Sequence, residues 1–236
     1  MSRAVLFDLD DTLFDHRRSA RAALRQVHRV HAPGFDFEAF ERHHARYLEE
    51  MHLEVLAGRI GLDDARRERF RRVFEALGVA LAPEVVDAVA SAYREGYITS
   101  RRPLDGAAEL LSALKPDARI AIVTNNLLDE QQDKLRHCGL APFVDVLVAS
   151  EDVGISKPEP GIFEIALARA GVSPASAVMV GDSWINDVGG ARAAGIAAVW
   201  FNPDRLPRPS DEEGIGEIAT LRPASEVARV LLERVA

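Results

Sequence analysis

The sequence predicts an α/β protein: a doubly wound, Rossmann-like parallel sheet carrying an inserted all-helical cap domain. Two observations support this fold class. From about residue 101 onward, short apolar runs rich in β-branched residues alternate with helical stretches, as is typical of a parallel sheet covered on both faces. Between residues 16 and 100 such runs are missing, and apolar residues recur at helical spacing instead.

The first predicted strand covers residues 3–8 (RAVLFD), a short apolar run that stops at an acidic cluster. This is the pattern of a buried strand that enters a loop. We assign this strand to the same sheet as the later ones, so that the helical block interrupts a single domain. The predicted catalytic core therefore comprises residues 1–15 and 101–236, and the predicted cap comprises residues 16–100.

Four sets of apolar residues predict four helices in the cap. Gly58, Gly78 and Pro83 mark the breaks between them. The sets are Ala20, Ala23, Leu24 and Val27; Phe40, Tyr47, Leu48, Met51 and Val55; Phe70, Val73, Phe74 and Leu77; and Val85, Val89 and Tyr93.

The remaining core is predicted to contain four more strands, with helices between them. Residues 202–216 carry three prolines among polar neighbours and indicate a surface loop. The strands are expected at 118–124, 144–149, 177–182 and 196–201, and the helices near 105–115, 127–138, 159–171 and 187–194.

Composition narrows the classes of partner. The chain has 236 residues, a formal net charge of −8 and a single cysteine, Cys138. An acidic balance disfavours a nucleic-acid polymer or an anionic membrane as partner, because both require clustered positive charge. A small anionic substrate remains compatible with this composition, since it responds to the local field of a pocket. No segment is apolar over the length that a signal peptide or a membrane span needs, so we expect a cytoplasmic protein. We expect it to be a monomer or a homodimer.

Residues with charged or reactive side chains follow the carboxyl ends of the predicted strands, where ligands bind in open parallel sheets. Each of them alone is more often a turn, cap or surface residue. Their joint occurrence in this order at successive strand ends is the informative observation. They are Asp8-Leu9-Asp10-Asp11-Thr12, Thr124-Asn125-Asn126, Ser156-Lys157-Pro158, and Gly181-Asp182-Ser183 with Asp187.

These motifs resemble the four motifs of the haloacid dehalogenase-like hydrolases. The pattern Asp8-x-Asp10-x-Thr12, Thr124, Lys157 and Gly181-Asp182-x-x-x-x-Asp187 has the order found in that superfamily. The helical insertion lies where its type 1 cap is found. Within the superfamily, the runs FDLDDTLFDH, VTNN and KPEPGIF are similar to pyrimidine 5′-nucleotidases, N-acylneuraminate 9-phosphatases and L-2-haloacid dehalogenases.

The resemblance implies an Mg²⁺-dependent phosphatase that works through an aspartyl-phosphate. Asp8 would be the nucleophile, and Asp10 would be the general acid and then the general base. The resemblance also implies that the Asp8 side chain, the Asp10 backbone carbonyl and the Asp182 side chain would hold Mg²⁺. Asp187 would act through a water or hold Lys157, and Lys157 would offset negative charge on Asp8 and the phosphoryl oxygens. Thr124 and the Asn125 amide would bind a phosphoryl oxygen.

Several functions remain open at this stage. The substrate is expected to be a small phosphorylated metabolite, a phosphomonoester, with a nucleoside 5′-monophosphate as one candidate. An L-2-haloacid dehalogenase shares the fold, but Asp10 argues against it because a leaving halide needs no proton. A phosphomutase of the same fold is a further alternative. Outside the enzymes, a phospho-accepting signalling domain or a binding protein is conceivable, although Asp10 would then lack a purpose.

Two clusters in the cap are ambiguous. The basic run Arg66, Arg67, Arg69, Arg71 and Arg72 is best interpreted as a solvated helix face with ion pairs rather than a substrate site. Three histidines lie on one helix without metal-site partners, and we expect a surface or packing role for them. They are His43, His44 and His52.

Overall fold

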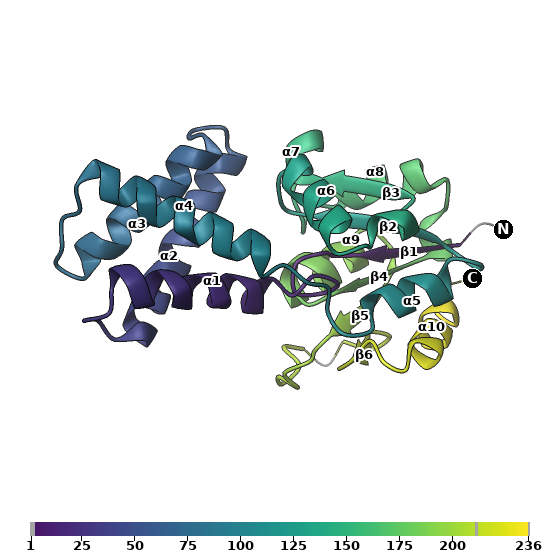
Figure 1. Ribbon diagram of the computed structural model, residues 1–236. Coiled ribbons are helices and arrows are strands. Elements are labelled where there is room, and N and C mark those ends of the chain that lie inside the picture. The colour runs from purple at the N-terminus through teal and green to yellow at the C-terminus, as the bar shows by residue number, and fades with distance from the viewer. Residues whose placement is uncertain (1–2, 211, 236) are drawn as a thin grey trace. The chain divides into compact units, whose positions relative to one another are not determined.

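The computed structural model describes residues 3–210 and 212–235 (Figure 1). The chain divides into two compact units. One, here called the core unit, contains the chain up to Asp15 and from Arg102 onward. The other, here called the helical unit, is His16–Arg101.

A six-stranded parallel sheet forms the centre of the core unit, with the order β3-β2-β1-β4-β5-β6. This confirms the predicted doubly wound fold. The order reverses at β1, and ligands bind at such switch points. Phe7, the last residue of β1, is in register with Ile122 of β2 and Val180 of β4, so Asp8 follows the central strand between two neighbours. The strands are β1 (Ala4–Phe7), β2 (Arg119–Thr124), β3 (Val146–Ala149), β4 (Ala177–Gly181), β5 (Ala197–Phe201) and β6 (Gly216–Ile218).

Helices cover both faces of this sheet; in Figure 1, α5 lies in front of it and α8 behind it. Alternate strand residues such as Leu6 and Ala121 pack on Ile162 and Phe163 of α8, because successive side chains point to opposite faces. The helices of the core unit are α5 (Ala107–Leu114), α6 (Leu128–His137), α7 (Ser150–Val153), α8 (Pro160–Ala170), α9 (Gly190–Ala193) and α10 (Ala224–Leu232).

Some elements of the core unit differ from the prediction. The helix expected near 187–194 begins earlier, with a π-helix over Trp184–Gly189 that leads into α9. Strand β6 and helix α10 were not predicted; β6 is only three residues long, too short for a two-residue alternation to be recognised.

Four helices make up the helical unit: α1 (His16–His31), α2 (Phe37–Leu56), α3 (Leu62–Ala76) and α4 (Pro83–Thr99). Helix α1 packs on α4 and α2 packs on α3. Gly58 and Gly78 follow α2 and α3 with φ of 67° and 81°, left-handed values that favour glycine. Pro83 is the first residue of α4, where its missing N–H costs nothing.

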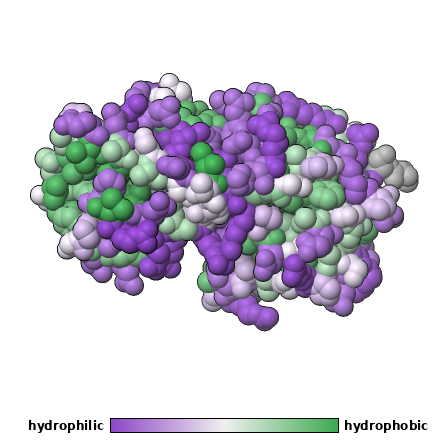
Figure 2. Space-filling view, viewed as in Figure 1, coloured by the Kyte–Doolittle hydropathy of each residue, from purple (hydrophilic) through white to green (hydrophobic). Residues whose placement is uncertain are grey.

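The apolar faces of these helices are mostly turned inward. Phe40, Phe70 and Phe74 are buried together in the interior of the helical unit. Figure 2 shows a group of apolar residues on the surface of this unit as well; Val30 and Leu53 are 63% and 58% exposed. Among the described residues, no helix combines the length and apolar character needed to cross a membrane.

The chain leaves and re-enters the core unit at hydrogen-bonded neighbours. The amide of Asp15 donates to the carbonyl of Arg102 at 3.1 Å, and the amide of Leu104 donates to the carbonyl of Leu13 at 2.8 Å. The guanidinium of Arg102 also pairs with the Asp15 carboxylate at 2.7 Å. The two ends of the insertion are therefore fixed to each other within the core unit.

Candidate active site

Asp8 and Lys157 form a buried ion pair at the end of β1. The Lys157 Nζ lies 2.7 Å from Oδ1 of Asp8, and the two residues are 5% and 7% exposed. The same ammonium group donates to Oδ1 of Asp187 at 2.6 Å and to the carbonyl of Val123 at 2.7 Å. A lysine has three N–H donors, so Lys157 is fully satisfied and holds a fixed orientation.

Asp187 reaches this cluster from the π-helix Trp184–Gly189, an element often found at functional sites. Its second oxygen accepts from the amide of Ser183 at 2.9 Å. A Cβ at Gly181 would overlap the Asp187 carboxyl group. Glycine at position 181 is therefore required by the side chain of Asp187.

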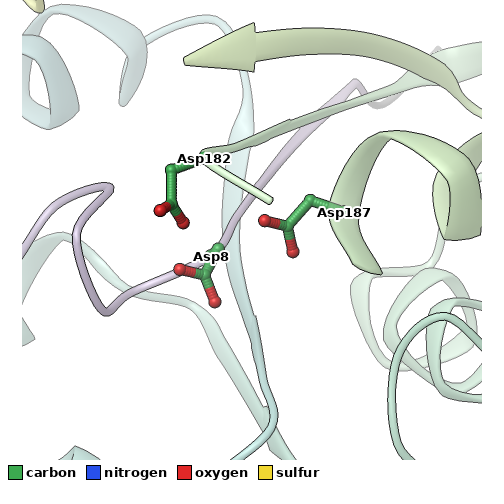
Figure 3. A group of neighbouring side chains, drawn as sticks. All are labelled: Asp8, Asp182 and Asp187. Carbon is green, nitrogen blue, oxygen red and sulfur yellow. The ribbon is translucent and has the colours of Figure 1, made fainter. Parts of the chain in front are cut away.

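Three carboxylates meet beside Lys157 (Figure 3). One oxygen from each of Asp8, Asp182 and Asp187 lies within 4.8 Å of the others. Thr12 helps to place Asp182, because its Oγ1 accepts the Asp182 amide at 3.1 Å. Trp200 donates from Nε1 to the Asp182 carbonyl at 2.9 Å. A set of hard oxygen donors at this separation fits Mg²⁺, which prefers carboxylate and water ligands.

The electrostatics of the cluster favour a cation there. Burial raises the pKa of Asp8 well above its ordinary value, and the negative charges of Asp187 and Asp182 add to that effect, against the opposing charge of Lys157. For Lys157, burial opposes the charged form, but the carboxylates of Asp187 and Asp8 outweigh it and raise the pKa of the lysine above its usual value. Additional positive charge would stabilise Asp8 as the carboxylate that a nucleophile must be.

Asp10 lies in a second polar cluster, whose other members the sequence did not reveal. Lys134 Nζ contacts both Asp10 carboxylate oxygens, at 2.6 and 2.8 Å. Gln131 donates from Nε2 to Oδ2 of Asp10 at 2.9 Å, and Asn126 donates from Nδ2 to the same oxygen at 3.0 Å. These side chains fix the orientation of the Asp10 carboxylate.

Thr124 and Asn125 connect the two clusters. Thr124 is buried, and its Oγ1 accepts from Gln131 Nε2 at 2.9 Å. The Asn125 side chain holds the backbone of Lys157: Oδ1 accepts from the Lys157 amide at 2.7 Å, and Nδ2 donates to the Lys157 carbonyl at 2.8 Å. The seven residues predicted to form the site thus take part in one of these two linked clusters: Asp8, Asp10, Thr124, Asn125, Lys157, Asp182 and Asp187. Their chemical roles stay predictions.

A signal for Gln131 and Lys134 did exist in the sequence. The two residues are three positions apart, so they lie on the same face of a helix. With Leu135 they are the buried residues of α6. A lysine is almost never fully buried unless it is paired, so a lysine at an inward-facing position indicates a nearby carboxylate. Sequence periodicity alone did not show which face of this mostly polar helix was inward.

The family model described as haloacid dehalogenase-like hydrolase matches residues 2–195. The chain belongs to this hydrolase family. It is 37% identical to a phosphoserine phosphatase of Thermus thermophilus, over 89% of this chain and 92% of that protein. It is 32% identical to the pyrimidine 5′-nucleotidase YjjG of Escherichia coli, over 96% of each. The chain is therefore an enzyme of the same hydrolase family as named phosphatases and nucleotidases.

Solved structures of the family agree with this fold. The putative HAD-hydrolase YfnB of Bacillus subtilis, solved bound to magnesium, aligns with a TM-score of 0.77 at 26% identity over 98% of both chains. A 2-haloacid dehalogenase of Pseudomonas syringae aligns with a TM-score of 0.67 at 28% identity over 99% of both chains. A dehalogenase thus shares this architecture, and the site residues must distinguish a phosphatase from a dehalogenase.

Proposed function

We propose that this hydrolase is an Mg²⁺-dependent phosphatase that cleaves a small phosphomonoester through a phosphorylated Asp8. One observation carries the proposal: Asp8 is held by Lys157 beside two further carboxylates, while the carboxylate of Asp10, two residues away, is oriented by its own lysine. A nucleophile and a separately held acid–base group are what a two-step transfer requires.

In the first step, an oxygen of Asp8 attacks the phosphorus atom and the ester P–O bond breaks. Asp10 gives a proton to the departing alkoxide, which leaves as the alcohol. Lys157 offsets the negative charge that Asp8 and the phosphoryl oxygens bring together, and Thr124 and the amide of Asn125 are proposed to bind a phosphoryl oxygen. Positioning and charge neutralisation provide most of the catalysis in phosphoryl transfer.

In the second step, water attacks the phosphorus of the aspartyl-phosphate, and Asp10 takes a proton from that water. The bond between phosphorus and Asp8 breaks, which returns the Asp8 carboxylate and releases inorganic phosphate. The Asp10 carboxylate accepts hydrogen bonds from Asn126, Gln131 and Lys134. These bonds hold it in one orientation, as a general base that takes a proton from the attacking water requires. One carboxyl group thus serves both steps.

Mg²⁺ would be held by the side chains of Asp8 and Asp182 and the backbone carbonyl of Asp10, with Asp187 acting through a water or through Lys157. It would supply positive charge to the substrate oxygens. The proposal is supported by the three converging carboxylates and by the raised pKa of Asp8, caused chiefly by burial.

Haloacid dehalogenation is the competing reaction, because dehalogenases share the architecture. A halide leaves without a proton, so dehalogenation does not require the acid–base function of Asp10. It also does not explain why three side chains donate hydrogen bonds to the Asp10 carboxylate. The phosphatase proposal accounts for them. Among phosphomonoesters, the named relatives act on chemically different compounds, including phosphoserine and pyrimidine nucleotides, and a nucleoside 5′-monophosphate is one candidate substrate.

The first test measures phosphate release from para-nitrophenyl phosphate with and without Mg²⁺. We expect Mg²⁺-dependent release by the wild-type protein and none by Asp8→Asn, which keeps the size of the side chain but removes the nucleophile. Chloride release from L-2-chloropropionate is measured in parallel. Chloride release without phosphate release would contradict the phosphatase proposal and support the dehalogenase.

A further inference from the structure

Arg69 differs from the other arginines of the basic run in α3. Arg66, Arg67, Arg71 and Arg72 each pair with a carboxylate, as expected of a solvated helix face. Arg69 is only 6% exposed, and it makes no hydrogen bond or ion pair with residues 3–210 or 212–235. The basic run therefore contains four ion-paired arginines and one buried arginine that has no counter-charge among the described residues.

The position of Arg69 follows from the helix. It lies four residues after Ala65 and four before Val73, and all three are buried on the face of α3 that turns inward. A methionine or leucine there would pack without the cost of burying a charge. The guanidinium carbon of Arg69 lies 4.9 Å from the ring centroid of Tyr93 and 5.3 Å from that of Phe70. Cation–π attraction offsets part of that cost, but it leaves the N–H donors unused.

A second buried donor group shares these aromatic neighbours. His44 of α2 is 4% exposed, and its Nε2 has no hydrogen-bond partner in the described chain. Its ring centroid lies 4.9 Å from that of Tyr93 and 5.4 Å from that of Phe70. The positive charge of Arg69 is also close enough to disfavour protonation of His44. Two unsatisfied nitrogen groups therefore face the same aromatic pair.

Buried polar groups are normally hydrogen-bonded, and each exception needs an explanation. Of the three guanidinium nitrogens of Arg69, Nε is the one that is both fully buried and unpartnered. The two terminal nitrogens, which also make no bond to described residues, keep some accessible surface. A planar guanidinium with unused donors binds carboxylate and phosphate groups through two parallel hydrogen bonds.

We propose that Arg69 and His44 form an oxyanion-binding site within the helical unit. The ligand group is a carboxylate or a phosphate, held by the Arg69 guanidinium and the Nε2–H of His44 against Tyr93 and Phe70. The group belongs to a small anion that binds to the helical unit. This inference rests on residues of the helical unit alone and does not depend on the proposed phosphatase chemistry.

The test follows the side-chain Nε–Hε resonance of Arg69 by NMR in protein labelled with ¹⁵N-arginine. The resonance is assigned by its loss in Arg69→Met, a variant that keeps an apolar side chain at the buried position. We expect acetate and inorganic phosphate to shift this resonance saturably in the wild-type protein. If no arginine Nε–Hε resonance of the wild-type protein shifts with either anion, the proposal is overturned, and this outcome does not require the variant.

Affinity provides the second measurement. Hydrogen bonds to a charged group are strong enough that Arg69→Met should raise the Kd for acetate about tenfold or more. Arg67→Met is the matched control, because Arg67 lies on the same helix but is ion-paired and half exposed, and it should leave this Kd unchanged. Equal effects of the two substitutions would also overturn the proposal.

Discussion

The ammonium group of Lys134 lies 2.6 Å from one oxygen of Asp10 and 2.8 Å from the other. This contact spans 124 positions of the sequence and joins the middle of α6 to the loop after β1. The Lys134 side chain is 3% exposed and the Asp10 side chain is 22% exposed, so salt screens this ion pair less than it screens a surface pair. It fixes the carboxylate that is proposed to move protons in both steps.

Replacing Lys134 by methionine should reduce kcat and leave KM for para-nitrophenyl phosphate nearly unchanged. Acid–base catalysis contributes about 10²–10⁴-fold, so we expect a loss of about tenfold or more. Arg136→Met, on the same helix but with a mostly exposed side chain, is the control and should retain full activity. A rise in KM with unchanged kcat would contradict the assignment of Lys134 to the orientation of Asp10.

Gly181→Ala should disrupt the carboxylate cluster. The added methyl group would occupy the space of the Asp187 carboxyl group, so Asp187 must move away from Lys157. We expect a large loss of kcat and a higher Mg²⁺ concentration for half-maximal activity, measured by Mg²⁺ titration of phosphate release. Gly34→Ala is the control, since no atom lies within 4 Å of a Cβ there. Unchanged Mg²⁺ dependence in Gly181→Ala would show that Asp187 does not influence the metal.

Lys157→Met should destabilise the protein in metal-free buffer. It leaves Asp8 and Asp187 buried without their shared cation, and breaking a buried ion pair typically costs about 3–5 kcal/mol. Urea unfolding should show a decrease of that size in the free energy of unfolding, partly restored by Mg²⁺. Lys115→Met removes a partly exposed pair with Asp145 and should cost about 1 kcal/mol or less. Equal losses in the two variants would contradict the difference in burial.

The stability of the helical unit should depend on pH through His44. Burial, with the nearby charges of Arg69 and His16, holds the pKa of His44 well below its ordinary value. In the unfolded chain His44 gains a proton near pH 6.5, while in the folded chain it stays neutral. The unfolded state therefore binds more protons below that pH, and stability falls as the pH falls.

His44→Phe tests this dependence while keeping an aromatic ring beside Phe70 and Tyr93. Between pH 7 and pH 5, the free energy of unfolding of the wild-type protein should fall more steeply than that of the variant, by up to about 1.4 kcal/mol per pH unit. Taking the difference between the two proteins cancels the titration of other groups. Parallel pH profiles would show that His44 has an ordinary pKa in the folded protein.

Much of the fold could be predicted from the sequence because its signals are local. Each strand of four or more residues was expected, since apolar runs bounded by polar loops are visible in a short window. The carboxylates at strand ends were expected to converge because parallel strands bring their carboxyl ends to one edge. Asp8, Asp182 and Asp187 do meet there.

The partners of the site residues could not be predicted in the same way. Gln131 and Lys134 reach Asp10 because of the rotation of α6 about its axis, which depends on packing across the sheet. Arg69 looked like its basic neighbours, and only its burial separates it from them. In both cases the sequence shows the residue types, but the identity of the partner, or its absence, is decided by tertiary structure.

The hydrogen bonds that join Asp15 to Arg102 and Leu13 to Leu104 have a consequence for the evolution of such proteins. They close the core unit at the base of the insertion, and all six strands that the structure describes lie outside His16–Arg101. Insertions of different length or sequence can be grafted at this point without a change in strand order or in the spacing of the acidic residues. Selection can therefore act on the inserted helices while the residues of the core unit stay fixed.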